Sequence, residues 1–465
     1  MRLLTCALAL IILPLGAAEE LLSDQWFSGT VGQHRAISAH EVVRRQGDSQ
    51  IASRFTMQMR LERVLGAAAA AMAMQQDRRY TEAADGSLVG FQFDDEMAGS
   101  RSSASGTVTD GIIRATVLHA GATRQQDLSI PDGATLRGYH AGQRQLASAE
   151  LAVGEQLEQM GIELIGGKLT LVTTTATLLA EEADGSRRFQ LVMNLNPTPV
   201  QATISPDGGL RRMQMQLGPL AIVITPSNGP QPLQAARIDA AALIAGDGTA
   251  PPARAQLRYR IPADRLAQLP ETAFQELQDG LLLVRSVGDA PAPDADTTAQ
   301  LLAAEAHLQT GDAAIRQWVE QQLAVPADAS TDQRAELLRL AVRGHLTRKD
   351  LTQADASASE CFASRTGDCT EHANLLVTAL RIANIPARRE IGLVYSGELG
   401  AWVGHAWVSA WDDDADCWIH LDAAYPGILR SHYLTTALGS GADGIAGLLA
   451  GAITLLGSEI NVVEE

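Results

Sequence analysis

The segment from Arg365 to Tyr425 constrains the fold more than any other part of the chain. Its apolar residues recur first at the spacing of a helix and then, in two stretches, at the spacing of a strand. After Cys369, apolar residues recur at the spacing of one helix face, at Ala373, Leu376, Val377, Leu380 and Ala383. Asp368 is a suitable N-cap before this run, and Asn384 with Pro386 indicates its end. The segment therefore predicts a helix that begins at Cys369.

Two strand patterns after this helix predict a hairpin. A strand is expected at Arg389–Tyr395, a glycine-containing loop follows, and His405–Trp411 then alternates between large or polar and small apolar residues. The acidic cluster Asp412–Asp414 is typical of a turn, and Cys417–Leu421 predicts the returning strand. The sequence thus places one histidine-bearing strand beside a strand that leads into an aspartate.

The register of this hairpin decides whether His405 meets Asp422. If the turn spans Asp412–Ala415, Trp411 pairs with Asp416 and His405 lies opposite Asp422 on the same face. Cross-strand partners have Cβ atoms about 5 Å apart, which allows a hydrogen bond from histidine to carboxylate. A slip of one residue would place the two side chains on opposite faces.

Cys369, His405 and Asp422 are the residue types of a thiol-based acyl-transfer centre. In such a centre a thiolate attacks a carbonyl, a histidine takes and returns protons, and a carboxylate orients the histidine. A helix N-terminus favours an anion, so the position of Cys369 favours its thiolate and supplies N–H donors for an oxyanion. We predict these three residues as nucleophile, base and orienting acid.

The same residues lie in sequence blocks that resemble a known family. GDCTEHA, GHAWV and WIHLD are similar to the three motif blocks of the bacterial transglutaminase-like superfamily, and the resemblance covers the last third of the chain. It implies a papain-like core with a triad formed by Cys369, His405 and Asp422. One departure is HLDAAYPG, where many relatives have Pro or Val before the Asp and Thr after it. The family includes peptidases, amidases, transamidases and members with no demonstrated activity.

Other roles for residues near Cys369 are open at this point. His372 lies one helical turn after Cys369 and is a competing base. A zinc site formed by cysteine, histidine and aspartate is chemically feasible, although the sequence has neither a CxxC nor an HExxH motif. Trp402, in the glycine loop before His405, is predicted to line an acyl-substrate cleft, whereas the later tryptophans fit core packing. No cofactor is implied.

Composition restricts the compartment and the partners. The 465 residues are 46% hydrophobic, enough for more than one core, and a net charge of −18 argues against nucleic acid as a partner. Met1–Ala18 has the pattern of a secretory signal peptide, which predicts a periplasmic or secreted protein; a retained anchor is the alternative. No later segment is long and apolar enough to predict a transmembrane span.

Removal of the signal peptide would leave Cys361, Cys369 and Cys417. In an oxidising compartment this odd number suggests one disulfide and one free thiol. We therefore consider a Cys361–Cys417 disulfide with Cys369 free. The alternative is that Cys361 and Cys417 are ordinary thiols.

Residues 19–287 are predicted to be rich in β-structure. Ser53–Val64 and Arg212–Leu217 alternate as strands do, and Ala67–Met74 fits either a helix or a strand of small residues. Asp-Gly turn signals begin at Asp85, Asp110, Asp132, Asp184, Asp207, Asp247 and Asp279. Similar patterns in residues 53–118 and 168–225 leave open a duplication and thus two sub-domains.

A Pro-rich acidic stretch, residues 288–296, predicts a linker before a catalytic domain of residues 297–465. Helices are expected at Thr297–Leu308, after Asp312 as far as Leu323, and from Thr331 to Leu346. A short helix and a strand at Glu459–Val463 are expected near residue 465. The predicted class is α+β: a β-rich N-terminal region followed by a papain-like, transglutaminase-like catalytic domain.

These features predict a secreted cysteine peptidase, amidase or acyltransferase that acts on a peptide or protein substrate, cell-wall peptides included. Hydrolysis is favoured, because transamidation needs a second site that binds an amine and excludes water. The alternative is a non-enzymatic binding or assembly protein that retains the transglutaminase-like fold.

Overall fold

The computed structural model describes residues 19–463 except for 48, 66–67, 98, 120, 166, 195, 218–219, 240–244, 247–248, 325–328, 350–355, 426, 440–453 and 456. The expected signal peptide Met1–Ala18, the turn at Asp247 and most of the expected short helix before Glu459 lie outside these described residues. Within the described part of the chain, no helix is long and apolar enough to cross a membrane.

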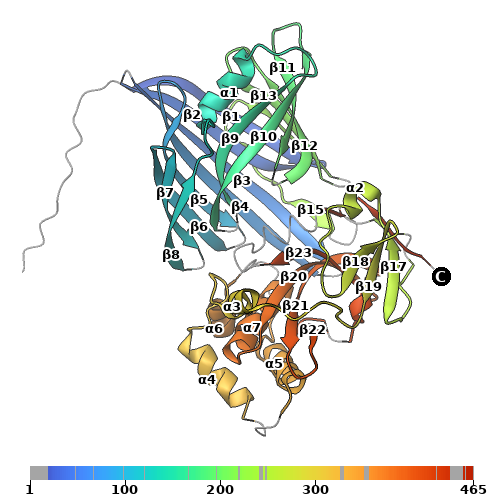
Figure 1. Ribbon diagram of the computed structural model, residues 1–465. Coiled ribbons are helices and arrows are strands. Elements are labelled where there is room, and N and C mark those ends of the chain that lie inside the picture. The colour runs from blue at the N-terminus through green and yellow to red at the C-terminus, as the bar shows by residue number, and fades with distance from the viewer. Residues whose placement is uncertain are drawn as a thin grey trace, which may run out of the picture.

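A single large sheet of fifteen strands contains most of the β-rich region (Figure 1). Its strands are β1 (Glu19–Val31), β2 (His34–Gln46), β3 (Gln50–Leu65), β4 (Ala68–Ala83), β5 (Leu88–Met97), β6 (Ser100–Thr109), β7 (Ile112–His119), β8 (Ala122–Ser129), β9 (Gln156–Ile165), β10 (Lys168–Glu181), β11 (Arg187–Met193), β12 (Asn196–Ile204), β13 (Leu210–Leu217), β14 (Leu220–Ser227) and β15 (Ala236–Asp239). Strands β1–β8 and β9–β14 form two antiparallel meanders, joined where β1 pairs with β14. The two halves therefore share one sheet.

Asp-Gly turns separate many of these strands, as the sequence predicts. The signals at Asp85, Asp110, Asp184 and Asp207 each connect two neighbouring strands of the large sheet. At Asp110 and Gly111 both residues have positive φ, 53° and 72°, which fits the twist of a tight hairpin. The signal at Asp132 differs, because it precedes helix α1 (Tyr139–Ser148) instead of a strand.

The large sheet buries one face around aromatic side chains. Phe27 and Phe189 are almost fully buried in one cluster and Phe93 in another. Helix α1 contributes Leu146 to the first cluster, which explains its position against this face. Of the run expected to be either helix or strand, residues 68–74 lie in strand β4, paired along its length with β3, and residue 67 lies outside the described residues.

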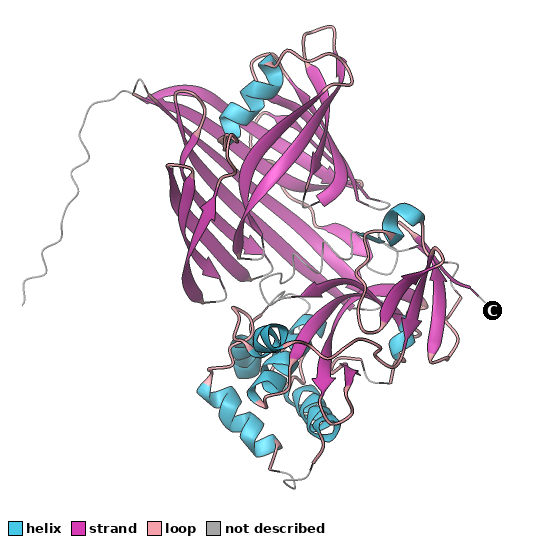
Figure 2. Ribbon diagram, viewed as in Figure 1, coloured by secondary structure: helices cyan, strands magenta, loops and turns pink. Residues whose placement is uncertain are grey.

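The helices of residues 295–382 gather at the opposite end of the molecule from α1 (Figure 2). They are α3 (Ala295–Leu302), α4 (Ala313–Gln322), α5 (Thr331–His345), α6 (Ala358–Ser364) and α7 (Cys369–Ile382). Helix α7 packs on a four-stranded antiparallel sheet in the order β22 (Cys417–Leu421), β21 (Ala401–Asp412), β20 (Ala387–Ser396), β23 (Tyr433–Gly439). The α+β class is confirmed, and the helix starts at Asp312, Thr331 and Cys369 agree with the sequence; α3 ends earlier than expected.

A five-stranded sheet crosses the expected domain boundary. Its order is β16 (Ala245–Gly246), β24 (Glu459–Val463), β17 (Gln256–Arg260), β19 (Leu281–Arg285), β18 (Gln275–Gln278), with the short helix α2 (Ala263–Leu266) beside it. Strand β24 was expected at these residues and pairs with β17, about 200 residues earlier. Tyr259 and Leu282 of this sheet pack on Leu393 and Trp402 of the four-stranded sheet. Packing is therefore continuous across residues 288–296, and the linker there remains a prediction.

Candidate functional site

The predicted nucleophile Cys369 lies in the first turn of α7. Asp368 caps the helix: its Oδ1 accepts from the N–H of Thr370 at 3.1 Å, and its own N–H donates to Glu371 Oε2 at 2.9 Å. Gly367 is required here, because a Cβ at this residue would lie 2.4 Å from the Cβ of Glu371. This reciprocal cap places Cys369, which is half-buried, as the first residue of the helix.

His405 lies between Cys369 and Asp422. It stands on β21, is 1% exposed, and its Nε2 lies 2.7 Å from Asp422 Oδ2. Its Nδ1 has no hydrogen-bond partner among the described residues, and the neighbouring Cys369 helps to raise its pKa. The structure thus brings the three predicted triad residues together.

The hairpin register differs from the expected one by two residues. Strand β21 pairs Asp412 with Cys417 and Val408 with Leu421, so the turn lies one residue later than predicted and β22 ends before Asp422. The contact between His405 and Asp422 survives because a slip of two keeps every side chain on its face. The two residues meet as diagonal neighbours, not as direct partners.

Four hydrogen bonds hold the carboxylate of Asp422. Oδ2 accepts from Tyr433 Oη at 2.8 Å as well as from His405, and Oδ1 accepts from the N–H groups of Ala424 and Tyr425 at 2.8 and 2.9 Å. Burial alone would raise the pKa of Asp422, but the positive charge and hydrogen bond of His405 and the Tyr425 N–H hold it well below its usual range. Asp422 is therefore ionised and fixed in orientation.

The pKa of His405 is raised to about 10. Burial opposes this protonation, but the charge and hydrogen bond of Asp422, followed by the influence of Cys369, outweigh it. These contacts favour an imidazolium at neutral pH. An imidazolium of this kind stabilises a neighbouring thiolate.

A buried ion pair between Arg430 and Glu390 lies next to Tyr433, which binds Asp422. Arg430 donates to Glu390 Oε2 at 3.1 Å and to the carbonyl oxygen of Tyr433 at 2.8 Å. On the next strand, Gly392 pairs with His405, and a Cβ at Gly392 would lie 1.9 Å from the carbonyl oxygen of Leu434. The close approach of β20 and β23 therefore positions Tyr433 against Asp422.

Comparison with known proteins agrees with this geometry. The family model of the transglutaminase-like superfamily matches residues 316–423, which include α7, β20, β21, β22 and Asp422. Residues 316–423 are a transglutaminase-like domain. No curated protein matches the chain.

Solved structures resemble the chain only distantly. A beta-barrel-like protein of unknown function (DUF1849) from Brucella abortus has a TM-score of 0.32 and 13% identity, and covers 45% of this chain and 98% of its own. A candidate cysteine protease from Cytophaga hutchinsonii has a TM-score of 0.29 and 13% identity, with coverages of 45% and 84%. A DUF1089 family protein from Pseudomonas aeruginosa has a TM-score of 0.24 and 15% identity, with coverages of 37% and 86%. At these values the likenesses carry no argument about function.

The transglutaminase-like domain does not place Trp402 where we expected it. Trp402 belongs to β21, because the glycine loop is shorter than predicted, and its ring is 4% exposed. It packs edge-on against Tyr259 and Tyr395, both at 5.6 Å between ring centroids, on the strand face opposite His405. Trp402 is therefore a core residue, and its expected position in a substrate cleft is wrong.

Tyr425 lies at the site and was not singled out from the sequence. Its ring is 4.9 Å from that of His405, measured between centroids, and it is half-buried. The turn at Asp422, whose Oδ1 accepts from the Tyr425 N–H, places Tyr425 at the site.

His372, the competing base, packs within the domain instead. Its Nδ1 is hydrogen-bonded to the carbonyl oxygen of Asp368 at 2.6 Å, and burial lowers its pKa.

The disulfide considered above is absent, since Cys361, Cys369 and Cys417 are all free thiols. Cys361 lies in the core beneath α7, where its Sγ contacts the carbonyl oxygens of Ala358 and Glu371 at 3.3 and 3.7 Å. Cys417 begins β22 beside the acidic turn. The pairing failed because the two residues belong to different layers of the domain.

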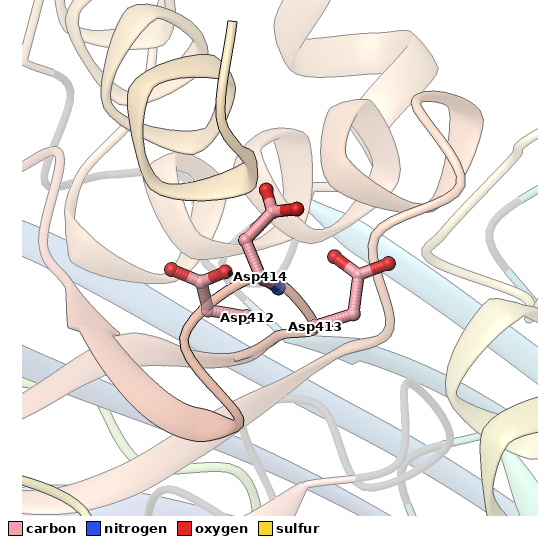
Figure 3. Close-up of side chains that lie close together, drawn as sticks. All are labelled: Asp412, Asp413 and Asp414. Carbon is pink, nitrogen blue, oxygen red and sulfur yellow. Dashed lines mark hydrogen bonds between the residues drawn. The ribbon is translucent and has the colours of Figure 1, made fainter.

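The carboxylates of the turn after β21, Asp412, Asp413 and Asp414, lie close enough together to suit a cation (Figure 3). Asp413 accepts from the hydroxyl of Thr331 and Asp414 from the Thr331 N–H, each at 2.6 Å, while Asp412 accepts from N–H groups within the turn. These contacts anchor the start of α5. We therefore assign the cluster a structural role.

A cavity of about 680 Å³ lies on the large sheet across β1–β7. Its lining includes Trp26, Arg54, Asp77 and Gln231, and none of the triad residues. The cavity is therefore separate from the thiol site.

Proposed function

We propose that this protein is a cysteine acyl-transfer enzyme that hydrolyses a peptide or amide bond. The observation that carries the proposal is the position of His405, which is buried between Asp422 and Cys369 with Nε2 bound to the carboxylate. A histidine held in this way can exchange protons with the thiol and with a leaving amine through Nδ1. A cysteine that only filled a core would not require this arrangement.

The reaction follows from these contacts. The Cys369 thiolate adds to the carbonyl carbon, and the N–H groups at the start of α7 stabilise the oxyanion. His405 gives its Nδ1 proton to the leaving nitrogen, the C–N bond breaks, and a thioester remains on Cys369. Neutral His405 then removes a proton from water, which attacks the thioester; release of the acid restores the thiolate and the imidazolium.

Several finer features are part of the proposal. We favour water over an amine as the second reactant, because hydrolysis needs no second binding site, whereas transamidation needs an amine site that excludes water. The predicted signal peptide supports action in the periplasm or outside the cell, on a peptide or protein substrate such as a cell-wall peptide. A binding or assembly protein remains the alternative, and it predicts an unreactive thiol.

Alkylation of Cys369 by iodoacetamide tests the proposal. We expect the labelling rate to remain high at mildly acidic pH, because the His405 imidazolium stabilises the thiolate. His405→Ala should remove this acid-side reactivity, and Cys369→Ala should remove the labelled peptide. The measurement is the rate of label incorporation into the Cys369 peptide across pH, read by mass spectrometry.

Cys417→Ala provides the matched control, because Cys417 is also partly exposed but has no histidine partner in the site. Its loss should leave labelling of Cys369 unchanged. Slow labelling of Cys369 that is indifferent to His405 would reject the enzyme and favour the binding protein.

A further inference from the structure

Two cations approach the thiol site from parts of the chain that are distant in sequence. Arg63 lies on β3 of the large sheet, and its Nη1 is 3.5 Å from Oδ2 of Asp368, the residue before Cys369. Lys349 follows α5, and its Nζ is 5.6 Å from the ring centroid of Tyr425. Neither residue takes part in the acyl-transfer steps described above.

The contact of Arg63 with Asp368 leaves most of the guanidinium available. A charge-assisted hydrogen bond between two such groups is normally about 2.7–2.9 Å long, so 3.5 Å is a weak contact. Arg63 has further N–H donors in its planar fork, and its side chain is 25% exposed. Asp368 meanwhile uses its other oxygen to cap α7.

Tyr425 connects both cations to the catalytic pair. Its ring packs against His405 on one side and carries Lys349 over its face. Burial raises the pKa of Tyr425 most, the negative charges of Cys369, Glu398 and Asp422 raise it further, and the charge of Arg63 offsets them. The field of Arg63 therefore reaches the same ring that contacts His405.

We propose that Arg63 and Lys349 form a cationic subsite that selects peptides carrying a carboxylate near the carbonyl attacked by Cys369. This inference rests on the proposed acyl-transfer function and adds a substrate class to it. It also gives the large sheet a role, because β3 supplies one of the two cations. In a chain of net charge −18, two cations that contact Asp368 and Tyr425, the neighbours of Cys369 and His405, oppose the overall repulsion of an anionic substrate.

Two alkylating reagents of similar size measure this field without a known substrate. Iodoacetate carries a carboxylate and iodoacetamide is neutral, so the ratio of their rates at Cys369 reports the local preference for an anion. In a Cys417→Ser background at low ionic strength, we expect this ratio to exceed that of a neutral unstructured peptide with one cysteine. Arg63→Gln and Lys349→Gln should each lower the ratio about 2- to 10-fold, and about 0.5 M salt should reduce these differences.

Matched variants separate a field effect from a structural one. Arg60→Gln removes the same charge from the opposite face of β3 and should leave the ratio unchanged. Glu398→Gln removes an exposed negative charge near Tyr425 and should raise the ratio. A variant that only loosened the packing would change both rates together and keep their ratio.

The outcomes distinguish the two proposals. A Cys369 that reacts fast with iodoacetamide but shows no change of ratio in Arg63→Gln and Lys349→Gln would overturn the subsite and leave the acyl-transfer function standing. A Cys369 that reacts with neither reagent faster than the peptide thiol would overturn both.

Discussion

Two histidines of the same sheet show how one contact decides a protonation state. His405 is buried and His420 is half-buried with both ring nitrogens enclosed, yet the pKa of His405 is raised to about 10 and that of His420 is lowered to about 3. Burial lowers the pKa of both histidines. The hydrogen bond of His405 to Asp422 outweighs this effect. His420 has no hydrogen-bond partner among the described residues, and the positive charge of Arg430 lowers its pKa further. The contact with Asp422 therefore keeps His405, the histidine near Cys369, protonated.

Asp422→Asn should lower the free energy of unfolding most between about pH 4 and 6.5. Because the pKa of His405 is raised to about 10, protonated His405 stabilises the folded state fully below about pH 6.5, the pKa of histidine in the unfolded chain. This contribution is lost as the pH rises through about 10. Because the pKa of Asp422 is lowered, ionised Asp422 stabilises the folded state fully above about pH 3.9, the pKa of aspartate in the unfolded chain. This contribution is lost at lower pH.

Urea unfolding of wild type and Asp422→Asn at about pH 5, 8 and 10 measures this dependence. The difference between the two proteins should shrink from the first pH to the last. Tyr433→Phe, which removes a neutral donor from the same carboxylate, should show a smaller and flatter difference. A difference that grows toward pH 10 would contradict the charge assignment.

At the scale of elements, a glycine sets the distance between β20 and β23. Gly392 lies opposite His405, and an added methyl group there would overlap the carbonyl oxygen of Leu434. The backbone of β23 would have to move away, and Tyr433 would move with it. The position of Asp422 thus depends on a residue that carries no side chain.

Gly392→Ala should therefore destabilise the protein by about 2–4 kcal/mol and slow the alkylation of Cys369. Gly404→Ala is the matched control on β21, because a Cβ at Gly404 meets nothing within 4 Å. Thermal unfolding and the labelling rate check both variants. Equal effects of the two substitutions would show that the close approach of β23 is not what matters.

Local chemistry made part of this region predictable from the sequence. The cap at Asp368, the helix from Cys369 and the strand Cys417–Leu421 each depend on neighbouring residues, and each was predicted correctly. The register was wrong by two, because several acidic residues in a row suit more than one turn. Tyr433 and Arg63 could not be predicted, since no local pattern specifies which distant residue reaches Asp422 or Asp368.

At the scale of the whole molecule, the four-stranded sheet that carries His405 packs against the five-stranded sheet, whose strands come from before and after it in sequence. Ile460 of β24 is 3% exposed and packs in one cluster with Tyr259, Leu393 and Trp402. This cluster covers the face of β20 and β21 opposite to His405. Trp402 belongs to the cluster because its side chain lies on that face. The sequence suggested a break at residues 288–296 because a Pro-rich stretch does not show what packs across it.

Ile460→Ala should lower the free energy of unfolding by about 2–5 kcal/mol, through lost apolar burial and the cavity that remains. Asn461→Ala, on the other face of β24, should change it by less than about 0.5 kcal/mol. Urea unfolding followed by tryptophan fluorescence is the measurement, since Trp402 lies in the same cluster. A small effect of Ile460→Ala would mean that β24 is not part of the stable core.

The pairing of β17 with β24 has a consequence for biosynthesis. Strand β17 emerges from the ribosome about 200 residues before its partner β24, so one edge of β17 is unpaired while the residues between the two strands are made. Consecutive strands within each meander of the large sheet pair with neighbours made moments earlier, whereas the pairing of β17 with β24, like that of β1 with β14, closes a long loop and should form later. The packing that β24 adds behind the four-stranded sheet, and thus behind His405, should therefore form only after residue 463 has been made.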